Sequence, residues 1–564
     1  HLQDHNMNKT RLMAQGHQYM ASGGHPLATQ TSLSILEAGG NAVDAAIAGA
    51  MVLGVVQSDL VNFAGVAPIM VRLPQTQQVV TVSGVGRWPM ATDINRFIEE
   101  FEGHVPEGIS RSIIPGAPDA FLTALEHFGT MSFKEVATGA INAAEKGFIM
   151  HELMAQTIKE NEAKYRKWPS NQEIYLPNGR PPEVGDLFIQ SNLARALKYM
   201  ADQESSARGS RDEKIDAARK AFYKGDIASA ISHFHNKNGG WITQEDLANF
   251  RVTLEPPIEV TRYGTKLFTC GSWCQGVSLA EMWSLLRNTK LADLGHNSAD
   301  YIHIVTEVIK VALADREHYV GDPDFVDVPL KKLLSGKYAK DRLSLIQKNS
   351  TLPNSSLWGD ESSSDKSDSF SQDTSYMCAV DKNGLVASIT PSDGSANTPV
   401  LPGWGINPSS RGSQSWAVRD HPSSVAPWKR PRLTPNPAIV VFEDGGVMPF
   451  GTPGADVQTQ AMLQVLLNIV DFNRPLQEAV ELPRFASYDA PDSFEPHSYQ
   501  RKLIKIEKGV EPDVKKTLTS YGHKVEDWPS NTWKAGAVCA ILDQANPRLL
   551  SGAADPRRPC LALG

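Results

Sequence analysis

A stretch rich in serine and aspartate, Ser355 to Gln372, interrupts this chain and constrains its fold more than any other segment. It offers little that a core could bury, so it predicts a linker without structure of its own. Beyond it, two apolar-rich segments follow Thr374 and are joined by residues 381–384. The Asn-Gly pair in that junction predicts a β-hairpin. We therefore expect a threonine to stand at the boundary between a linker and a buried hairpin.

The position of Thr374 suggests a nucleophile. A threonine hydroxyl reacts poorly unless a base lies beside it, and the α-amino group of an N-terminal threonine can be that base. Its unperturbed pKa is about 7.7–8.0, so much of the amine can accept a proton at working pH. Cleavage between Asp373 and Thr374 would release this amine, and attack by Thr374 on its own preceding carbonyl is the simplest route. The alternative is that Thr374 merely opens a strand after a surface loop.

Composition places the chain among ordinary globular proteins, with 41% apolar and 21% charged residues. Its 564 residues allow two to four domains, or one large α/β domain. A net charge of -8 and the lack of a basic cluster argue against a nucleic-acid partner. No apolar run reaches the roughly 18 residues of a membrane span. The start at His1 lacks the apolar core of a signal peptide, and Met7 is a candidate native start, so we expect a cytoplasmic protein.

The sequence predicts neither a metal nor a cofactor. Its five cysteines are too few and too scattered for a disulfide framework, so free thiols are expected. Residues 270–274 differ from the cysteine-protease motif in their last two positions. His151-Glu152 lacks the second histidine of a zinc helix, and Gly84-Val-Gly86 lacks the third glycine of a dinucleotide loop.

Helical and strand patterns alternate along the chain. Residues 25–56 predict two helices broken at Gly39-Gly40-Asn41, with Asn41 capping the second. Further helices are expected, from N- to C-terminus, at about 115–127, 132–146, 193–201, 214–222, 226–236, 243–249, 277–288, 298–316 and 457–470. Strands are expected at 67–73, 78–82, 262–270, 438–442 and 447–450. Strands on both sides of the linker with helices outside them indicate a layered α/β sandwich.

Motifs in the same order over about 530 residues resemble the gamma-glutamyltranspeptidase family of N-terminal-nucleophile hydrolases. They are Gly23–Ala28, Gly39–Ala46, Pro115-Gly116, Phe222–Gly225, Ile242–Leu247, Ala314–Arg316, Gly321–Phe325, the Thr374 hairpin, Gly451–Gly454 and Ala554–Arg557. The resemblance implies a four-layer αββα sandwich in one structural domain. It also implies cleavage into a large chain, 1–373, ending in the linker, and a small chain, 374–564. These would form a heterodimer, and a dimer of such pairs is left open.

The resemblance also assigns roles around the nucleophile. Ser392 lies where the family has a second hydroxyl group that hydrogen-bonds the nucleophile; alternatively it is a hairpin-end serine bonding its own backbone. Gly454 and Ala455 match paired glycines whose backbone N–H groups face the developing oxyanion. Such a donor typically lowers the reaction barrier by about 3–4 kcal/mol. Ala455 can replace glycine if its backbone angles are ordinary. Without the resemblance, Gly454 would be a simple turn glycine.

The substrate segments depart from true transpeptidases. The segment that supplies their acidic residues reads Ser-Arg-Gly-Ser-Gln-Ser at 410–415 and offers no carboxylate, and Leu433-Thr434 replaces their paired serines. Gly394 replaces an asparagine and Val85 an arginine. A substrate ammonium would lack its acidic partner, so glutamyl selection is not expected.

Four residues are candidates for substrate contact: Arg87, Ser413, Gln414 and Thr434. Arg87 could hold a substrate carboxylate through a bidentate pair, or could equally be a structural arginine that bonds loop carbonyls. Arg411 is a weaker candidate and is expected at the surface.

Other motifs resemble the non-transpeptidase branch of the family, which includes oxamate amidohydrolase and related acylases; they are residues 84–89, 274–276 and 429–434. We therefore expect a metal-independent, self-processing amidohydrolase for a small, non-glutamyl substrate, with the acyl group carried on Thr374. Two alternatives remain open. One is a gamma-glutamyl hydrolase or transpeptidase with an altered recognition loop, and the other is an uncleaved binding homologue.

Overall fold

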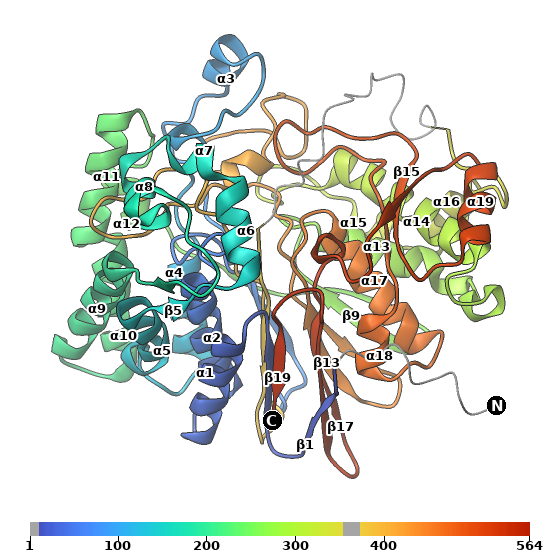
Figure 1. Ribbon diagram of the computed structural model, residues 1–564, viewed down its shortest axis with the longest axis horizontal. Helices are drawn as coiled ribbons and strands as arrows, with labels where there is room; N and C mark the ends of the chain where they lie inside the picture. The colour runs from blue at the N-terminus through green and yellow to red at the C-terminus, as the bar shows by residue number, and fades with distance from the viewer. Residues whose placement is uncertain (1–10, 354–372) are drawn as a thin grey trace.

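Two stacked seven-stranded sheets form the centre of the molecule (Figure 1). The computed structural model describes residues 11–353 and 373–564, so the linker expected at 355–372 lies outside the described residues. One sheet runs β1 (Ala14–Gly16), β18 (Leu549–Ala554), β17 (Cys539–Gln544), β13 (Val447–Gly451), β12 (Ala438–Val441), β9 (Thr265–Thr269), β8 (Ile258–Arg262). The other runs β19 (Leu561–Leu563), β2 (Met20–Gly23), β10 (Met377–Val380), β11 (Val386–Ile389), β3 (Ile69–Arg72), β4 (Val79–Val82), β7 (Leu254–Glu255).

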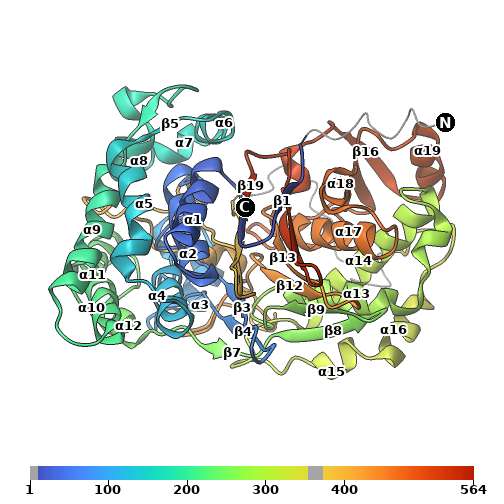
Figure 2. The same cartoon turned by 90° about the horizontal axis from the view of Figure 1, so that it is seen from below.

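Helices cover the outer face of each sheet, which gives the four-layer αββα order expected from the sequence (Figure 2). Outside the β10 sheet lie α1 (Pro26–Glu37), α2 (Ala42–Val56), α4 (Ala117–Phe128), α5 (Phe133–Lys146), α6 (Glu152–Glu160), α7 (Glu162–Tyr165), α8 (Pro169–Tyr175), α9 (Ser191–Ser206), α10 (Arg211–Tyr223), α11 (Asp226–Asn238) and α12 (Gln244–Asn249). Outside the β13 sheet lie α13 (Gly276–Leu285), α14 (Ala299–Tyr319), α15 (Leu330–Leu333), α16 (Gly336–Leu343), α17 (Val457–Val470), α18 (Leu476–Glu481) and α19 (Pro512–Ser520). Helix α3 (Ile94–Glu100) projects beside these layers (Figure 1).

Strands from both sides of the linker share both sheets. In the second sheet, β10, β11 and β19 follow the linker, whereas their neighbours β2 and β3 precede it. Every pairing within the two large sheets is antiparallel. Residues 11–353 and 373–564 therefore build one body together.

The predicted hairpin forms the middle of its sheet. Met377 pairs with Ile389 and Val380 with Val386, while β2 flanks β10 on its other edge. Side chains of β10 alternate between the α2 side, where Met377 and Ala379 pack, and the inter-sheet core, where Cys378 packs. A strand buried on both faces needs apolar residues throughout, which explains its nearly continuous apolar sequence.

The two predicted N-terminal helices, α1 and α2, are also present. Gly39 turns the chain with a φ of 94°. Asn41 then caps α2, and the side chains of Asn41 and Asp44 form a reciprocal capping box. All residues of α2 are buried, so the helix serves as the support on which the hairpin packs.

The predicted strand at 262–270 was wrong in its extent. The chain forms the hairpin β8–β9 there, turning at Tyr263 and Gly264, both of which have positive φ. Because β8 alternates buried and exposed residues, its apolar content is low and its strand pattern was missed. Beyond residue 470 the structure adds elements that were not predicted: α18, α19, β17, β18, β19 and a small sheet of β14 (Phe485–Ser487), β15 (Leu503–Glu507) and β16 (Lys524–Trp528). Strands β5 (Phe148–Ile149) and β6 (Leu187–Phe188) pair separately.

Among the described residues, no helix combines the length and the apolar character needed to cross a bilayer.

Asp381 joins the hairpin turn to α2, and its removal should destabilise the fold. Its carboxylate accepts hydrogen bonds from the backbone N–H groups of Ala42 at 3.0 Å, Asn383 at 2.8 Å and Leu385 at 3.2 Å. Asp381→Ala leaves these donors unpaired and should lower the free energy of unfolding by about 2–4 kcal/mol in urea titrations. The neighbouring exposed Lys382→Ala is the control. Equal stability of the two variants would contradict this role.

Candidate active site

Thr374 lies fully buried just before β10, with its side chain in a closed ring of hydrogen bonds. Its hydroxyl donates to Asp373 Oδ1 at 2.9 Å and lies 2.6 Å from Ser392 Oγ. Arg411 donates to Asp373 Oδ2 at 2.5 Å and also to Ser392 Oγ. Since Ser392 Oγ accepts from Arg411, its own proton is free to point at Thr374 Oγ1. Hydrogen bonds arranged head to tail polarise one another, which favours a reactive hydroxyl here.

The backbone at Thr374 is strained. Its φ is 79°, a region that β-branched residues rarely occupy. Its N–H donates to the carbonyl of Leu60 at 2.9 Å, which holds the peptide bond in place. Such conformations cost about 1–3 kcal/mol. The angle φ of Thr374 is defined in part by the carbonyl carbon of Asp373, so it exists as a constraint only while the two residues are joined. Breaking the bond between Asp373 and Thr374 would release the strain.

Ser392 is positioned by the segment around Val66, which lies beside it. Its backbone forms a bridge with Val66, in which Ser392 N–H donates at 2.9 Å to the Val66 carbonyl. Its side chain contacts Thr374 and Arg411 in place of its own backbone. The structure thus brings Ser392 and Thr374 together, as the resemblance implied.

Arg411 is not at the surface, so that prediction was wrong. Its side chain has no exposed area, and it pairs with Asp373 at 2.5 Å and with Asp393 at 3.2 Å. Asp393 also accepts from the hydroxyl groups of Ser409 at 2.5 Å and Ser410 at 2.7 Å. The polar neighbours of Arg411 in the sequence suggested a loop, but they serve to satisfy a buried ion pair, which the local sequence does not reveal.

Gly454 and Ala455 lie at the N-terminus of α17. Neither backbone N–H group has an acceptor within the described part of the chain. Ala455 has a φ of 51°, in the left-handed region that glycine favours, so the condition of ordinary backbone angles for an alanine at this position is not met. Gln275 fixes this turn by donating to the carbonyls of Ala455 and Thr434, at 3.0 Å each.

The predicted substrate contacts fall into two places. Gln414 donates to Thr434 Oγ1 at 2.9 Å, and Arg411 reaches the same oxygen at 3.2 Å, so both residues adjoin the ring. Ser413 lines the neighbouring cavity. Arg87 lies elsewhere: it binds the Trp428 carbonyl and Asp324, each at 2.9 Å, and does not line that cavity. This agrees with the structural alternative for Arg87, and its contact with substrate stays a prediction.

A polar cavity of about 460 Å³ ends at Asp373. Its wall near the nucleophile is formed by Asp373, Gly394, Ser410 and Ser413, whereas Thr374 does not line it. The side chain of Asp373 thus stands between the cavity and the threonine hydroxyl in the uncut chain. Its departure would open the cavity toward Thr374.

Asp59 is a residue of this cavity that the sequence analysis missed. Its side chain is buried, lines the cavity, and has no hydrogen-bond partner on either carboxylate oxygen in the described structure. Burial raises its pKa to about 7, although nearby Arg558 acts in the opposite direction. Arg558 also donates to the carbonyl of Thr374 at 3.4 Å. No motif surrounds Asp59, so only the fold reveals it.

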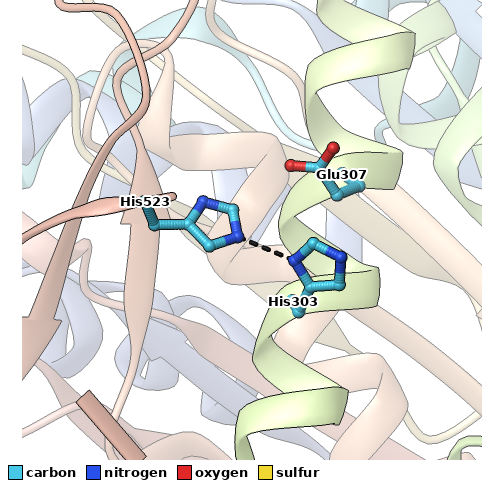
Figure 3. A group of neighbouring side chains, drawn as sticks. All are labelled: His303, Glu307 and His523. Atoms are coloured by element: carbon cyan, nitrogen blue, oxygen red, sulfur yellow. Dashed lines mark hydrogen bonds between the residues drawn. The ribbon is translucent and has the colours of Figure 1, made fainter. Parts of the chain in front are cut away.

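One group of described residues has the composition of a metal site. His303 and Glu307 project from α14 toward His523, which precedes β16 (Figure 3), and their ligand atoms lie within 4.8 Å of one another. The histidines are far apart in the chain, so no spacing motif announced them. His303 Nε2 lies 2.7 Å from the Gln347 carbonyl, so it carries the proton, and Nδ1 accepts from His523 Nε2 at 2.7 Å.

The charges around this group oppose a cation. Glu307 accepts from Thr351 Oγ1 at 2.8 Å and from Lys310 Nζ at 3.1 Å. Burial lowers the pKa of His523 to about 3, and the neighbouring His303 acts in the same direction. A metal ion would have to break the bond between the histidines beside a buried ammonium group. The structure therefore accounts for the two histidines as a hydrogen-bonded pair and for Glu307 as the partner of Lys310 and Thr351.

The raised pKa of Asp59 predicts a pH-dependent stability. The folded pKa of Asp59, about 7, exceeds its ordinary value of 3.8. The contribution of Asp59 to the free energy of unfolding is therefore full below about pH 4 and is lost as pH rises from there through 7. Asp59→Asn cannot ionise, so it should exceed the parent protein in unfolding free energy at pH 8, by up to about 4 kcal/mol, and match it near pH 4. Urea titrations at both pH values, with exposed Asp212→Asn as control, would measure this. A constant difference between pH 4 and pH 8 would contradict it.

The sequence of this chain is similar to those of a known family and of several characterised proteins. The family model described as Gamma-glutamyltranspeptidase matches residues 28–564. The chain is 28% identical over 564 residues to the glutathione hydrolase proenzyme of Bacillus subtilis (strain 168), covering 97% of this chain and 91% of that protein. It is 30% identical over 543 residues to the Acylase ACY 1 proenzyme of Pseudomonas sp. (strain V22), covering 94% and 90%.

Solved structures of related proteins have the same fold. LmbA2991HD superposes with a TM-score of 0.92 at 31% identity, covering 99% of this chain and 100% of that one. The cephalosporin acylase from Bacillus halodurans, at 24% identity, shares the fold with a TM-score of 0.83, covering 99% and 98%. The resemblance, the αββα fold class and the amide-hydrolase class predicted from the sequence are thereby confirmed. The chain belongs to the gamma-glutamyltranspeptidase family.

Proposed function

We propose that this protein is a self-processing amidohydrolase in which Thr374 is the nucleophile and a small, non-glutamyl amide is the substrate. The observation that carries the proposal is the hydrogen-bond ring that joins Thr374 to Ser392, Asp373 and Arg411 at the bond to be cut. Relatives named proenzymes support processing into two chains that stay together. A cytoplasmic location and a dimer of such pairs remain predictions from the sequence.

Self-cleavage begins with the Thr374 hydroxyl, which attacks the carbonyl carbon of Asp373. The amine of Thr374 is still in a peptide bond at this stage, so another base must take the hydroxyl proton. The Asp373 carboxylate is that base, because it accepts the hydroxyl at 2.9 Å and burial raises its pKa. The C–N bond breaks as the proton passes to the nitrogen, and water then hydrolyses the resulting ester.

Turnover of substrate uses the amine released by this cleavage. The amine takes the proton from Thr374 Oγ1 as the hydroxyl attacks an amide carbonyl, and then gives it to the leaving group. The free N–H groups of Gly454 and Ala455 are the candidate donors to the oxyanion, and the N-terminus of α17 adds its positive end. Water releases the acyl group from Thr374.

The recognition segment favours a non-glutamyl substrate over the gamma-glutamyl alternative. Residues 410–415 bring a buried guanidinium, Arg411, to the nucleophile and supply no carboxylate. A substrate ammonium there would face a positive charge and lose its hydration, both of which weaken binding. The strain at Thr374 argues against the alternative of an uncleaved binding homologue, because binding alone does not require a strained backbone at this position.

Thr374→Ala should remain one chain of about 61.6 kDa and lose amide hydrolysis, because alanine has no nucleophile. Mass spectrometry of the denatured protein would show two fragments for the parent, the smaller beginning at Thr374. Thr374→Ser keeps a hydroxyl and is the control that should still be cut. A processed Thr374→Ala protein would overturn the mechanism.

Asp373→Asn tests the proposed base of self-cleavage. An amide cannot accept the proton, so cleavage should slow by about 10²–10⁴-fold, the usual range for loss of a general base. The half-time of conversion from one band to two on a denaturing gel measures this. Exposed Asp513→Asn should convert at the parent rate. If Asp373→Asn also converts at that rate, the carboxylate is not the base.

A further inference from the structure

Arg411 is the one cation in the ring at Thr374, and the cleavage reaction removes one of its partners. In the uncut chain it holds the carboxylate of Asp373 at 2.5 Å and that of Asp393 at 3.2 Å. Asp393 belongs to the small chain and stays after cleavage. Asp373 becomes the free end of the large chain, which is no longer tied to Thr374.

Loss of Asp373 leaves a buried charge with an open position. In the uncut chain the Arg411 side chain has no exposed area, so its charge relies on protein partners. Asp393 still pairs with Arg411 Nε at 3.2 Å, but the terminal nitrogen that holds Asp373 Oδ2 would keep only the Ser392 hydroxyl as a partner. A buried guanidinium with unused N–H groups beside a cavity is suited to a carboxylate.

The chemistry of self-cleavage fixes where that carboxylate stands in a substrate. Attack by Thr374 Oγ1 forms a C–O bond to the carbonyl carbon of Asp373, the C–N bond breaks, and the hydroxyl proton ends on the new amine. The product is an ester on Thr374 with the same connectivity as an acyl-enzyme made from an external amide. Asp373 is therefore the first acyl group this site carries, and its side chain already binds Arg411.

The carbon skeleton of that first acyl group is succinyl. In an aspartyl residue, two carbon atoms separate the scissile carbonyl from the side-chain carboxylate. An external acyl group of the same length would place its carboxylate on Arg411 while its carbonyl reaches Thr374. The cavity of about 460 Å³ beyond Asp373 would take the remainder of the substrate.

The geometry points to short dicarboxylic monoamides, of the succinyl type, as the substrates of the mature site, with Arg411 as the residue that selects them. Cleavage before Thr374 then does two things: it frees the amine and uncovers the anion site. This inference rests on the proposed function for the identity of the reaction, but the anion site itself can be tested without catalysis.

Binding of succinate to uncut protein tests the anion site. In Thr374→Ala, Asp373 stays in place and should block Arg411, whereas the double variant Asp373→Ala/Thr374→Ala should bind succinate at least tenfold more tightly by calorimetry. Adding Arg411→Gln to the double variant should abolish this gain. Adding Arg180→Gln, which removes an exposed arginine that pairs with Glu183 outside the cavity, should leave it unchanged. Circular dichroism would show that each variant is folded.

Two results would overturn the anion site: equal affinity of the single and double variants, or a gain that survives Arg411→Gln in folded protein. Neither result depends on Thr374 being a nucleophile.

Activity of the processed parent protein tests substrate selection. Among the anilides of oxalyl, malonyl, succinyl, glutaryl and neutral butyryl groups, the succinyl compound should have the highest kcat/KM, at least 100-fold above butyryl. Succinate binding without cleavage of any anilide would reject the proposed function and keep the anion site. Equal cleavage of succinyl and butyryl anilides would keep amide hydrolysis and reject the selection by Arg411.

Discussion

The site depends on a buried ion pair that lies across the bond to be cut. Arg411 binds the carboxylate of Asp373, and the same carboxylate accepts the hydroxyl of Thr374. Both charges are removed from water, so each depends on its protein partners, which for Arg411 include Asp393 as well as Asp373. Ser392, which follows the second strand of the hairpin, closes the ring. Every member of the ring is buried and hydrogen-bonded, so the Thr374 hydroxyl is held in one place between Asp373 and Ser392.

The scaffold holds this ring in a buried position. The hairpin that carries Thr374 lies in the middle of its sheet, between β2 and β3, with α2 on one face and the second sheet on the other. Asp381 ties its turn to the start of α2. A strand held on four sides cannot shift to relieve strain, which allows Thr374 to keep a φ of 79°. In the proposed self-cleavage, breaking the preceding bond would relieve this strain and release Asp373 from Thr374, so the uncut and processed sites would differ in charge as well as in covalent structure.

Much of this arrangement could be predicted from local sequence. The hairpin around Asn383-Gly384, the capping of α2 by Asn41 and the span of α17 follow from signals within a few residues, and the structure agrees with each. The strand predicted at 262–270 contains β9 but was wrong in its extent, because it runs across the turn at Tyr263-Gly264 into β8, which carries few apolar residues. Arg411 was placed at the surface because serines and glycine surround it, although its partners Asp373 and Asp393 bury it.

The sequence by itself predicted Thr374 as the candidate nucleophile, many of the helices and strands, and the family, because these rest on residue types and on spacing along the chain. Tertiary structure decided which charges meet at Thr374, that Ala455 takes a left-handed conformation, and that Asp59 stands unpartnered in the cavity. The physical reason is that burial and charge pairing arise between segments far apart in sequence. The free energy of a buried charge depends on all the groups around it, and no local pattern records them.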